Sequence, residues 1–399
     1  MRALKREISL TFTVDLPDGK LDTIMAVLAG VLLQIIAQVV NEVAVGFAET
    51  MLEKIVCGKC LRSGFLHWKT RHGEPTLLET LFGRIQIPQL QVQCSCGHKF
   101  FITRYVLGLE RRKHISHTTE KKLGLLGSLT SFRVAAKITS MFGIAMDKMR
   151  TWRAVQKVAD TVTFELDPNQ KGELEADGTG IPSIGIKKRG RELKVAVQRM
   201  FGGRIRIAGL GIGAYDGGWD AIFAPMLSII KGFKRFLLVT DGDTSIFKAL
   251  GDIVHVILQR CLFHIPHQFK YSLWMDKVKR KCSDWYSAMG AIHSICSARY
   301  LDKDKETVRK AVDERLKQLD TLIATCENNG WKHSAEYLQN AKLDLFTGIL
   351  NRFSGHTTSL AERVMRTVNM RINYGKWSER GALNVNKIRL AYYYNGFDA

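Results

Sequence analysis

The spacing of apolar and polar positions changes several times along the chain, and each spacing predicts a different kind of element. Residues 20–55 carry apolar side chains at helical intervals, which predicts a long helix. Residues 57–105 break into short apolar runs, with strict alternation at residues 84–87, which predicts small strands. Residues 118–160 return to helical spacing. The first part of the chain is therefore expected to contain a helix, a small β-region and a second helical region.

The second half alternates between apolar strands and short helices. Strands are predicted at 174–176, 193–198, 205–214, 235–239 and 254–258, and helices near 219–230 and 246–250. Three strands, a helix, a strand, a helix and a strand describe an α/β layer. Residues 265–350 show helical spacing throughout, with one apolar stripe formed by Val308, Val312, Leu316, Leu319 and Leu322.

The charge balance is the first observation that bears on function. The chain has 59 lysines and arginines against 38 aspartates and glutamates, which gives a net charge of +21. Such an excess points first to nucleic acid and second to an anionic membrane surface. The hydrophobic fraction of 46% and the charged fraction of 24% are those of a folded globular protein and exclude a wholly disordered chain.

One stretch is apolar enough to raise the question of a membrane. Residues 23–41 are uncharged, but Gly30, Gln34 and Gln38 interrupt them, and no basic cluster borders them. The first residues also lack the apolar core and cleavage site of a signal peptide. We therefore interpret residues 23–41 as a buried or dimer-forming helix. We expect a cytoplasmic, nucleoid-associated protein that does not bind a membrane.

Two cysteine pairs predict a metal site. Cys57 and Cys60 flank a Gly-Lys turn, and Cys94 and Cys96 flank a serine. Thiolates suit a structural Zn²⁺, and cytoplasmic thiols stay reduced. One structural zinc ion is therefore predicted at these four cysteines. Because only one residue separates the second pair, His98 could replace Cys96; four buried cysteines without a metal are the alternative interpretation.

The helical region that follows is strongly basic. Residues 100–160 contain twelve lysines and arginines against four acids. Helices over 131–141 and 147–158 with a glycine turn between them resemble a helix-turn-helix, which would bring three basic side chains to DNA phosphates: Lys148, Arg150 and Arg153. The spacing departs from the usual motif, so a plain helical hairpin with solvated charges is the competing interpretation.

Carboxylates at strand ends are the most informative residues. Asp177 and Asp241 each follow an apolar run and stand beside a glycine. A carboxylate at a strand end is held by rigid backbone, and two on adjacent strands can share a pair of Mg²⁺ ions that promote phosphoryl transfer. A single Asp-Gly also forms ordinary turns, so only the occurrence of two such aspartates at strand ends indicates a metal site. Asp243 competes with Asp241 for the role.

These carboxylates belong to a set of four motifs in a fixed order: Asp177-Gly-Thr-Gly, Asp241-Gly-Asp, Cys261-Leu-Phe-His264 and Glu362-Arg-x₂-Arg. The set resembles the Mutator-like DDE transposases of bacterial and archaeal insertion sequences, and the likeness covers about residues 75–395. It implies a ribonuclease H-like catalytic domain with an all-helical insertion before the helix that carries the glutamate.

The resemblance also implies roles for particular residues. Asp177, Asp241 and Glu362 would hold two Mg²⁺ or Mn²⁺ ions. Cys261 and His264 would lie beside the site, without a role that the sequence defines.

Further basic residues surround these motifs. Arg363 and Arg366 follow Glu362 and would hold phosphates near the metal, although an ordinary exposed glutamate paired with Arg366 fits the same residues. A second basic block spans residues 187–206. It is expected to hold DNA across the carboxylates through Lys187, Lys188, Arg189 and Arg191, with a solvated charged hairpin as the alternative.

The expected organisation is an N-terminal helical region (1–55), a zinc-ribbon-like domain (56–110), a helical DNA-binding region (111–165) and an α/β ribonuclease H-like domain (166–399) with a helical insertion at about 265–350. The expected function is a DNA transposase that cuts and joins the ends of an insertion sequence, as a homodimer or higher oligomer on DNA. The alternatives are a non-catalytic DNA-binding protein derived from a transposase and a metal-dependent DNA nuclease.

Overall fold

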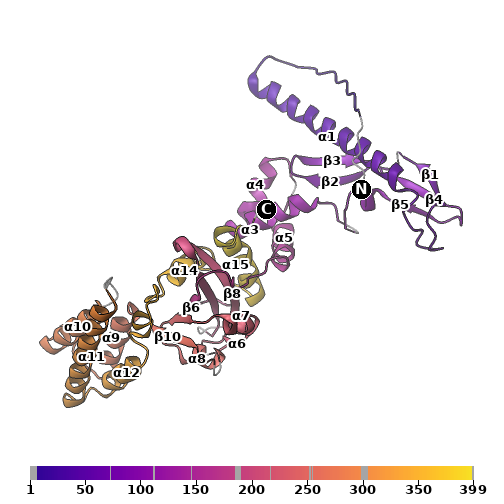
Figure 1. Cartoon of the computed structure of the whole chain (residues 1–399). Helices are drawn as coiled ribbons and strands as arrows, with labels where there is room; N and C mark the ends of the chain where they lie inside the picture. The colour runs from indigo at the N-terminus through magenta and orange to yellow at the C-terminus, as the bar shows by residue number, and fades with distance from the viewer. Residues whose placement is uncertain are drawn as a thin grey trace. The chain divides into compact units, whose positions relative to one another are not determined.

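The computed structural model describes residues 7–71, 73–110, 113–144, 146–184, 190–215, 217–250, 253, 255–297 and 304–397. The chain divides into two units, one ending at Val158 and the other beginning at Ala159, close to the expected start of the catalytic domain at 166. Figure 1 labels most of the elements of both units. The basic residues Lys187, Lys188 and Arg189 lie outside the described residues.

The first unit is built on one long helix, α1 (Leu21–Met51), as the spacing predicted. Its five short strands are β1 (Leu66–Thr70), β2 (Thr76–Thr80), β3 (Gly83–Ile87), β4 (Gln91–Cys94) and β5 (Lys99–Phe101). They form two separate antiparallel sheets, the hairpin β2–β3 and a sheet of order β1-β4-β5. The alternation predicted at 84–87 is confirmed, because Ile85 and Ile87 of β3 are buried while Arg84 and Gln86 are exposed.

The same unit continues with helices α2 (Thr103–Val106), α3 (His117–Leu129), α4 (Phe132–Met141) and α5 (Lys148–Asp160). Ser131 caps α4, and the Asp147 carboxylate accepts the Met149 and Arg150 amides at the start of α5. A Cβ on Gly127 of α3 would lie 2.8 Å from the Thr151 side chain of α5. This glycine therefore lets α3 and α5 pack closely.

The second unit contains one five-stranded sheet of order β10-β9-β6-β7-β8. Its strands are β6 (Glu173–Gly180), β7 (Glu192–Arg199), β8 (Ile205–Gly213), β9 (Phe236–Thr240) and β10 (Val256–Arg260). The first three are antiparallel to one another, whereas β9 runs parallel to β6 and β10 runs parallel to β9. The prediction for the last strand was wrong by two residues, since β10 begins at Val256 rather than at 254.

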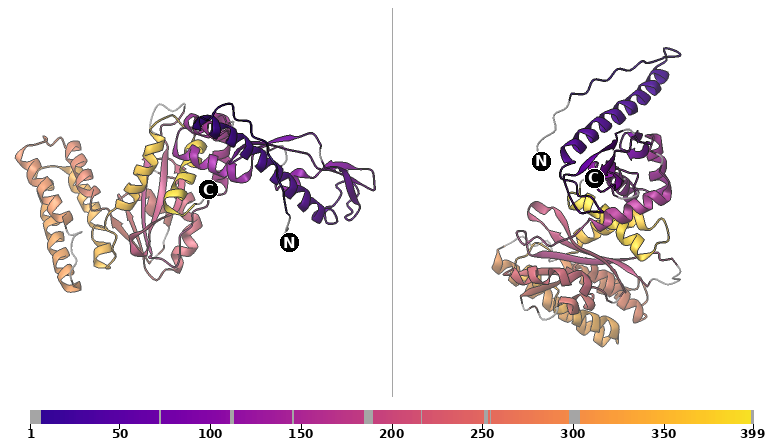
Figure 2. Two further views of the ribbon diagram at one scale, coloured as in Figure 1. Left: turned by 90° about the horizontal axis from the view of Figure 1, so that it is seen from above. Right: turned by 90° about the vertical axis from the view of Figure 1, so that its right-hand side faces the viewer.

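Helices cover both faces of this sheet (Figure 2). The helix predicted near 219–230 is broken into α6 (Asp220–Phe223), a 3₁₀ turn (Ala224–Met226) and α7 (Leu227–Gly232), because Pro225 lacks the amide that a continuous helix needs. These segments and α8 (Thr244–Leu250) pack against Leu174 and Ala176 of β6. On the other side, α14 (Ser359–Ile372) packs on β6 and α15 (Glu379–Tyr394) packs on β8.

Side chains alternate along β6, and the alternation decides which face receives its acids. Leu174 and Ala176 point into the apolar cluster with α6 and α7. Glu173, Glu175 and Asp177 therefore face the other side, where α14 lies. The strand carries three carboxylates in a row on one face.

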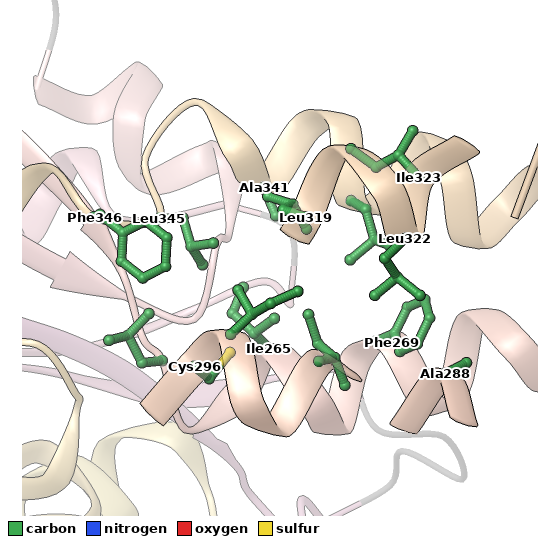
Figure 3. Close-up of a cluster of buried hydrophobic side chains, with 14 of the residues drawn as sticks. Ile265, Phe269, Ala288, Cys296, Leu319, Leu322, Ile323, Ala341, Leu345 and Phe346 are labelled. Atoms are coloured by element: carbon green, nitrogen blue, oxygen red, sulfur yellow. The ribbon is translucent and has the colours of Figure 1, made fainter. Parts of the chain in front are cut away.

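The expected all-helical insertion separates β10 from α14, but it is not one continuous helix. In the described part of the chain it consists of α9 (His264–Met275), α10 (Ser283–Cys296), α11 (Lys305–Asn328), α12 (Lys332–Lys342) and α13 (Thr347–Leu350). Figure 3 shows its own apolar core, in which Leu319 and Leu322 of the predicted stripe gather with Phe269 of α9. Asp344 anchors the insertion to β10 through a bidentate ion pair, in which Arg260 Nε and Nη2 donate to its two carboxylate oxygens at 2.8 and 3.2 Å.

Candidate functional site

The four cysteines of the first unit form one cluster. Cys57 and Cys60 stand in the turn before β1, and Cys94 and Cys96 stand at the β4–β5 turn. Their four sulfur atoms all lie within 4.8 Å of one another, with 3.7 Å between Cys57 and Cys96 and 3.6 Å between Cys60 and Cys94. The cluster could hold a metal ion. Cys96 completes it; His98 is not a member, and its ring stacks on Phe100.

The thiols of this cluster ionise unequally, because neighbouring sulfurs help to lower the pKa of Cys57 but help to raise that of Cys94. The Cys60 amide is the main cause that lowers the pKa of Cys57 to about 6. The Cys96 amide likewise favours the Cys94 thiolate, but burial and the neighbouring sulfurs outweigh it and raise the pKa of Cys94 to about 12. A bound cation would offset this inequality, because it stabilises all four thiolates together.

In the second unit, the sheet brings two of the predicted carboxylates to the same edge. Asp177 lies near the end of β6, and Asp241 follows β9 directly. Because β6 and β9 are parallel, their carboxyl ends meet at one edge of the sheet. Both aspartates line one cleft of about 1110 Å³.

Helix α14 brings the third carboxylate, Glu362, to this edge in its first turn. The Nε2 atom of His264, at the start of α9, lies 3.6 Å from Oε1 of Glu362. Glu362 therefore pairs with His264, and the alternative pairing with Arg366 is not the arrangement found.

Cys261 and His264 join β10 to α14. The Thr358 amide and hydroxyl donate to the Cys261 sulfur at 3.2 and 3.3 Å, and the same hydroxyl lies 3.3 Å from Nδ1 of His264. Thr358 is the residue that precedes α14. The Cys-x₂-His motif thus contacts the segment from which the Glu362 helix begins.

The electrostatics link these groups. Burial raises the pKa of Asp177 to about 6, and the charges of Asp241 and Glu362 act in the same direction, against the Gly178 amide and His264. A hydrogen bond with Cys261 raises the pKa of His264 to about 9, with a further contribution from Asp177 and Glu362 against the effect of burial. His264 therefore offsets part of the negative charge of the three carboxylates.

The three carboxylates lie at the same edge of the sheet but do not all line one cleft. Glu362 lines a neighbouring depression of about 480 Å³ with Phe263 and His356, whereas Asp177 and Asp241 line the main cleft. Across the described ranges, the four cysteines are the one group of three or more Cys, His, Asp or Glu whose ligand atoms lie within 4.8 Å. The carboxylate site is open.

Asp243, the competitor of Asp241, has a different environment. Its Oδ1 accepts from the Ser245 amide and hydroxyl at 2.8 and 2.6 Å, and its Oδ2 accepts from the Trp219 indole at 3.1 Å. Both oxygens therefore hold the start of α8 and the α6 segment in place. This favours Asp241 as the site residue of the two.

Two residues that the sequence analysis did not single out fix the position of α14. The Glu175 Oε2 atom accepts the Leu360 and Ala361 amides at 2.8 and 3.0 Å, so a carboxylate of β6 binds the N-terminus of the helix that carries Glu362. Arg199 donates to the other oxygen at 2.8 Å. Burial raises the pKa of Glu175 to about 7 despite these partners. The sequence pattern could have indicated Glu175, because it stands two residues before Asp177 and therefore lies on the same face of the strand.

Two buried cations in the cleft were also missed. Lys194 of β7 is 1% exposed, pairs with Glu192 at 3.1 Å and lies over the Trp219 ring. Arg260 lines the same cleft beside Gly242. In the basic block at 187–206, Lys194 is therefore part of the wall of the site and not of a solvated hairpin.

The remaining predicted DNA contacts are on exposed surfaces. Arg363 and Arg366 are exposed on α14 and follow the site's glutamate by one and four residues. Arg191 is paired with Glu379 at 2.8 Å, with both side chains nearly half exposed. On α5 of the first unit the exposed basic residues are Lys148, Arg150 and Arg153.

Comparison with known proteins gave no family: no family model matches the chain, and no curated protein is significantly similar to it.

Proposed function

We propose that this protein is a DDE-type DNA transposase whose second unit is a ribonuclease H-like catalytic domain. One observation carries the proposal: carboxylates at the ends of β6 and β9 and on α14 converge at one edge of the sheet, although Asp177 and Glu362 are 185 residues apart in the chain. The hydrogen bond that joins β6 to α14, from the Leu360 amide to Glu175, spans the same 185 residues. The sheet order supports the fold, since three antiparallel strands followed by two parallel ones are what a ribonuclease H-like domain is expected to have.

The donor set suits two Mg²⁺ or Mn²⁺ ions at Asp177, Asp241 and Glu362. Carboxylate oxygens are the ligands that these hard cations prefer. Burial is the main cause of the raised pKa of Asp177, and the charges of Asp241 and Glu362 add to it; a bound divalent cation would offset all three effects by stabilising the carboxylate. When bound, such ions activate an attacking oxygen and stabilise the leaving oxygen of a phosphodiester.

The residues of this chain would position the reaction. Glu175 and Arg199 hold the N-terminus of α14, and therefore Glu362, against β6. Arg363 and Arg366 on the exposed face of that helix would contact phosphates next to the scissile bond. His264 carries a positive charge beside Glu362 and limits how far the acids repel DNA.

The first unit would bind one structural zinc ion and contribute to DNA binding. A tetrahedral Zn²⁺ with Zn–S bonds of about 2.3 Å has sulfur atoms roughly 3.8 Å apart. The distances of 3.7 and 3.6 Å in the cluster agree with this geometry. The exposed cations of α5 would contact phosphates, so binding should weaken steeply as salt rises.

A strand-transfer assay tests the proposal. The purified chain would be incubated with Mg²⁺ and labelled DNA taken from both sides of its coding sequence, with a plasmid as target. Joined products are expected from the wild type and none from Asp177→Asn. Cleavage without joining would instead indicate a nuclease, and salt-sensitive binding without cleavage a non-catalytic DNA-binding protein.

A further inference from the structure

Helix α1 has two apolar faces, and only one of them is covered. In its middle, Leu33, Ile36, Ala37 and Val40 pack on the buried residues of the β2–β3 hairpin. A different set of apolar residues faces away from the hairpin. Four of these are 71%, 58%, 48% and 52% exposed: Leu21, Met25, Leu28 and Leu32.

The four exposed residues and two half-buried ones, Ile35 and Val39, follow a heptad. Together they are spaced by alternating steps of four and three residues. This is the spacing of the a and d positions that meet in a coiled coil. The seam covers roughly 27 Å of helix at 1.5 Å per residue, and it ends where Glu42 takes the next core position.

We propose that this heptad seam pairs with the same seam of a second copy of this chain, so that two α1 helices form a coiled coil. The inference rests on α1 and its hairpin alone and does not depend on the proposed catalytic function. It assigns the expected homodimer to a particular surface. Knobs-into-holes packing of the seam would remove the large exposed apolar side chains from water.

A second copy suits this surface better than a bilayer does. Helix α1 has 31 residues and contains an 18-residue stretch with a mean hydropathy of 2.3, so it is long and apolar enough to cross a membrane. Acids dominate both of its ends, however: Asp15, Asp18 and Asp22 precede the apolar stretch, and Glu42, Glu49 and Glu53 follow it, against the single lysines Lys20 and Lys54. Anionic lipid repels such ends.

The packed face gives a second reason. Leu33, Ile36 and Ala37 lie within the apolar stretch and cover the hairpin core. Insertion into a bilayer would strip them from that core and expose Leu78 and Ile85 to water. Pairing through the heptad seam leaves this packing intact, because the seam lies on a different face of the helix.

The test compares two double variants of the full chain by sedimentation equilibrium without DNA. Leu28→Glu with Leu32→Glu places two charges in the seam. The matched control, Ala26→Glu with Gln34→Glu, places two charges at exposed positions of the same helix outside it. The wild type and the control are expected to be dimers, and the seam variant should have a dimer Kd about 100-fold higher or more.

Three results would overturn the proposal. They are a wild type that is monomeric at all concentrations, a seam variant that dimerises as tightly as the control, and wild-type protein that floats with vesicles of phosphatidylcholine and phosphatidylglycerol while the seam variant does not. Unchanged helical circular dichroism and zinc content in the seam variant would show that it remains folded.

Discussion

The cysteine cluster and the carboxylate site differ in how each is assembled. The four sulfurs come from two tight turns within one small β-region and lie within 4.8 Å of one another. The three carboxylates come from two strands and a helix that an entire helical insertion separates in the chain, and they line two neighbouring depressions. The four sulfurs are close enough to surround one ion, whereas the three carboxylates are spread along a cleft and a neighbouring depression.

The difference corresponds to two kinds of metal chemistry. A structural metal needs a full set of protein ligands and stabilises the fold that holds them. A catalytic metal needs free positions for substrate, so its carboxylates can stand farther apart and depend on other residues for their placement. On our proposal, the cysteine cluster serves folding and the carboxylate site serves chemistry.

Removing one cysteine should have the largest effect. Cys57→Ser should lose the zinc ion and destabilise the β-region by about 5 kcal/mol or more, because binding energy at a structural site is folding energy. Metal analysis and thermal unfolding measure both effects. Cys282→Ser is the control, since Cys282 only caps α10 and serine can replace it there. Equal zinc in Cys57→Ser and the wild type would contradict the prediction.

The carboxylate site should respond in the opposite way, losing activity and keeping its fold. Asp177→Asn, Asp241→Asn and Glu362→Gln should each reduce strand cleavage by about 1000-fold or more, equivalent to about 4 kcal/mol. Unfolding and DNA binding should change little, because each substitution keeps the shape of the side chain.

Asp243→Asn is the control for this set. It should cleave DNA but lose about 1 kcal/mol of stability, since one amide oxygen cannot accept from both Ser245 and Trp219. An inactive Asp243→Asn together with an active Asp241→Asn would move the site residue to position 243.

The burial of Asp177 beside two other acids should also make stability depend on pH. Asp177 has a pKa of about 6 in the folded chain and 3.8 without its surroundings. The folded state therefore holds a proton that the unfolded state releases, so stability is full below pH 3.8 and falls as pH rises to about 6. The loss is at most about 3 kcal/mol.

Urea unfolding in chelator, compared between the wild type and Asp177→Asn, isolates this contribution. The difference in the free energy of unfolding should change across that pH window, and added Mg²⁺ should reduce the change. A difference that is the same at pH 4 and pH 6 would show that the pKa of Asp177 is not raised in the folded chain.

The smallest expected effect tests the placement of Glu362. Glu175→Gln keeps the size of the side chain but weakens its bonds to Arg199 and to the start of α14, at about 2 kcal/mol of stability. Cleavage should fall about tenfold, less than in Glu362→Gln. Glu165→Gln, at an exposed position of the same unit, should change neither property. Unchanged cleavage in Glu175→Gln would show that Glu362 does not depend on it.

Patterns local in the chain were sufficient for many features. Alternation predicted β3, helical spacing predicted α1 and the stripe on α11, and the cysteine spacing predicted the cluster. Each depends on neighbours within a few residues or within one hairpin-sized segment. The break between α6 and α7 was missed although Pro225 was visible, because the apolar spacing continues through it.

Sequence patterns were enough to predict most of the helices and strands, the excess of positive charge, the four cysteines of the cluster and the candidate carboxylates. Only the tertiary structure decided that Glu175 binds the N-terminus of α14, that Lys194 is buried in the cleft, and that Asp243 supports two helices while Asp241 remains the candidate ligand. The reason is physical. Periodicity records which face of an element is apolar, but a buried polar side chain takes its role from the partner that folding brings to it, and here those partners lie up to 185 residues away in the chain.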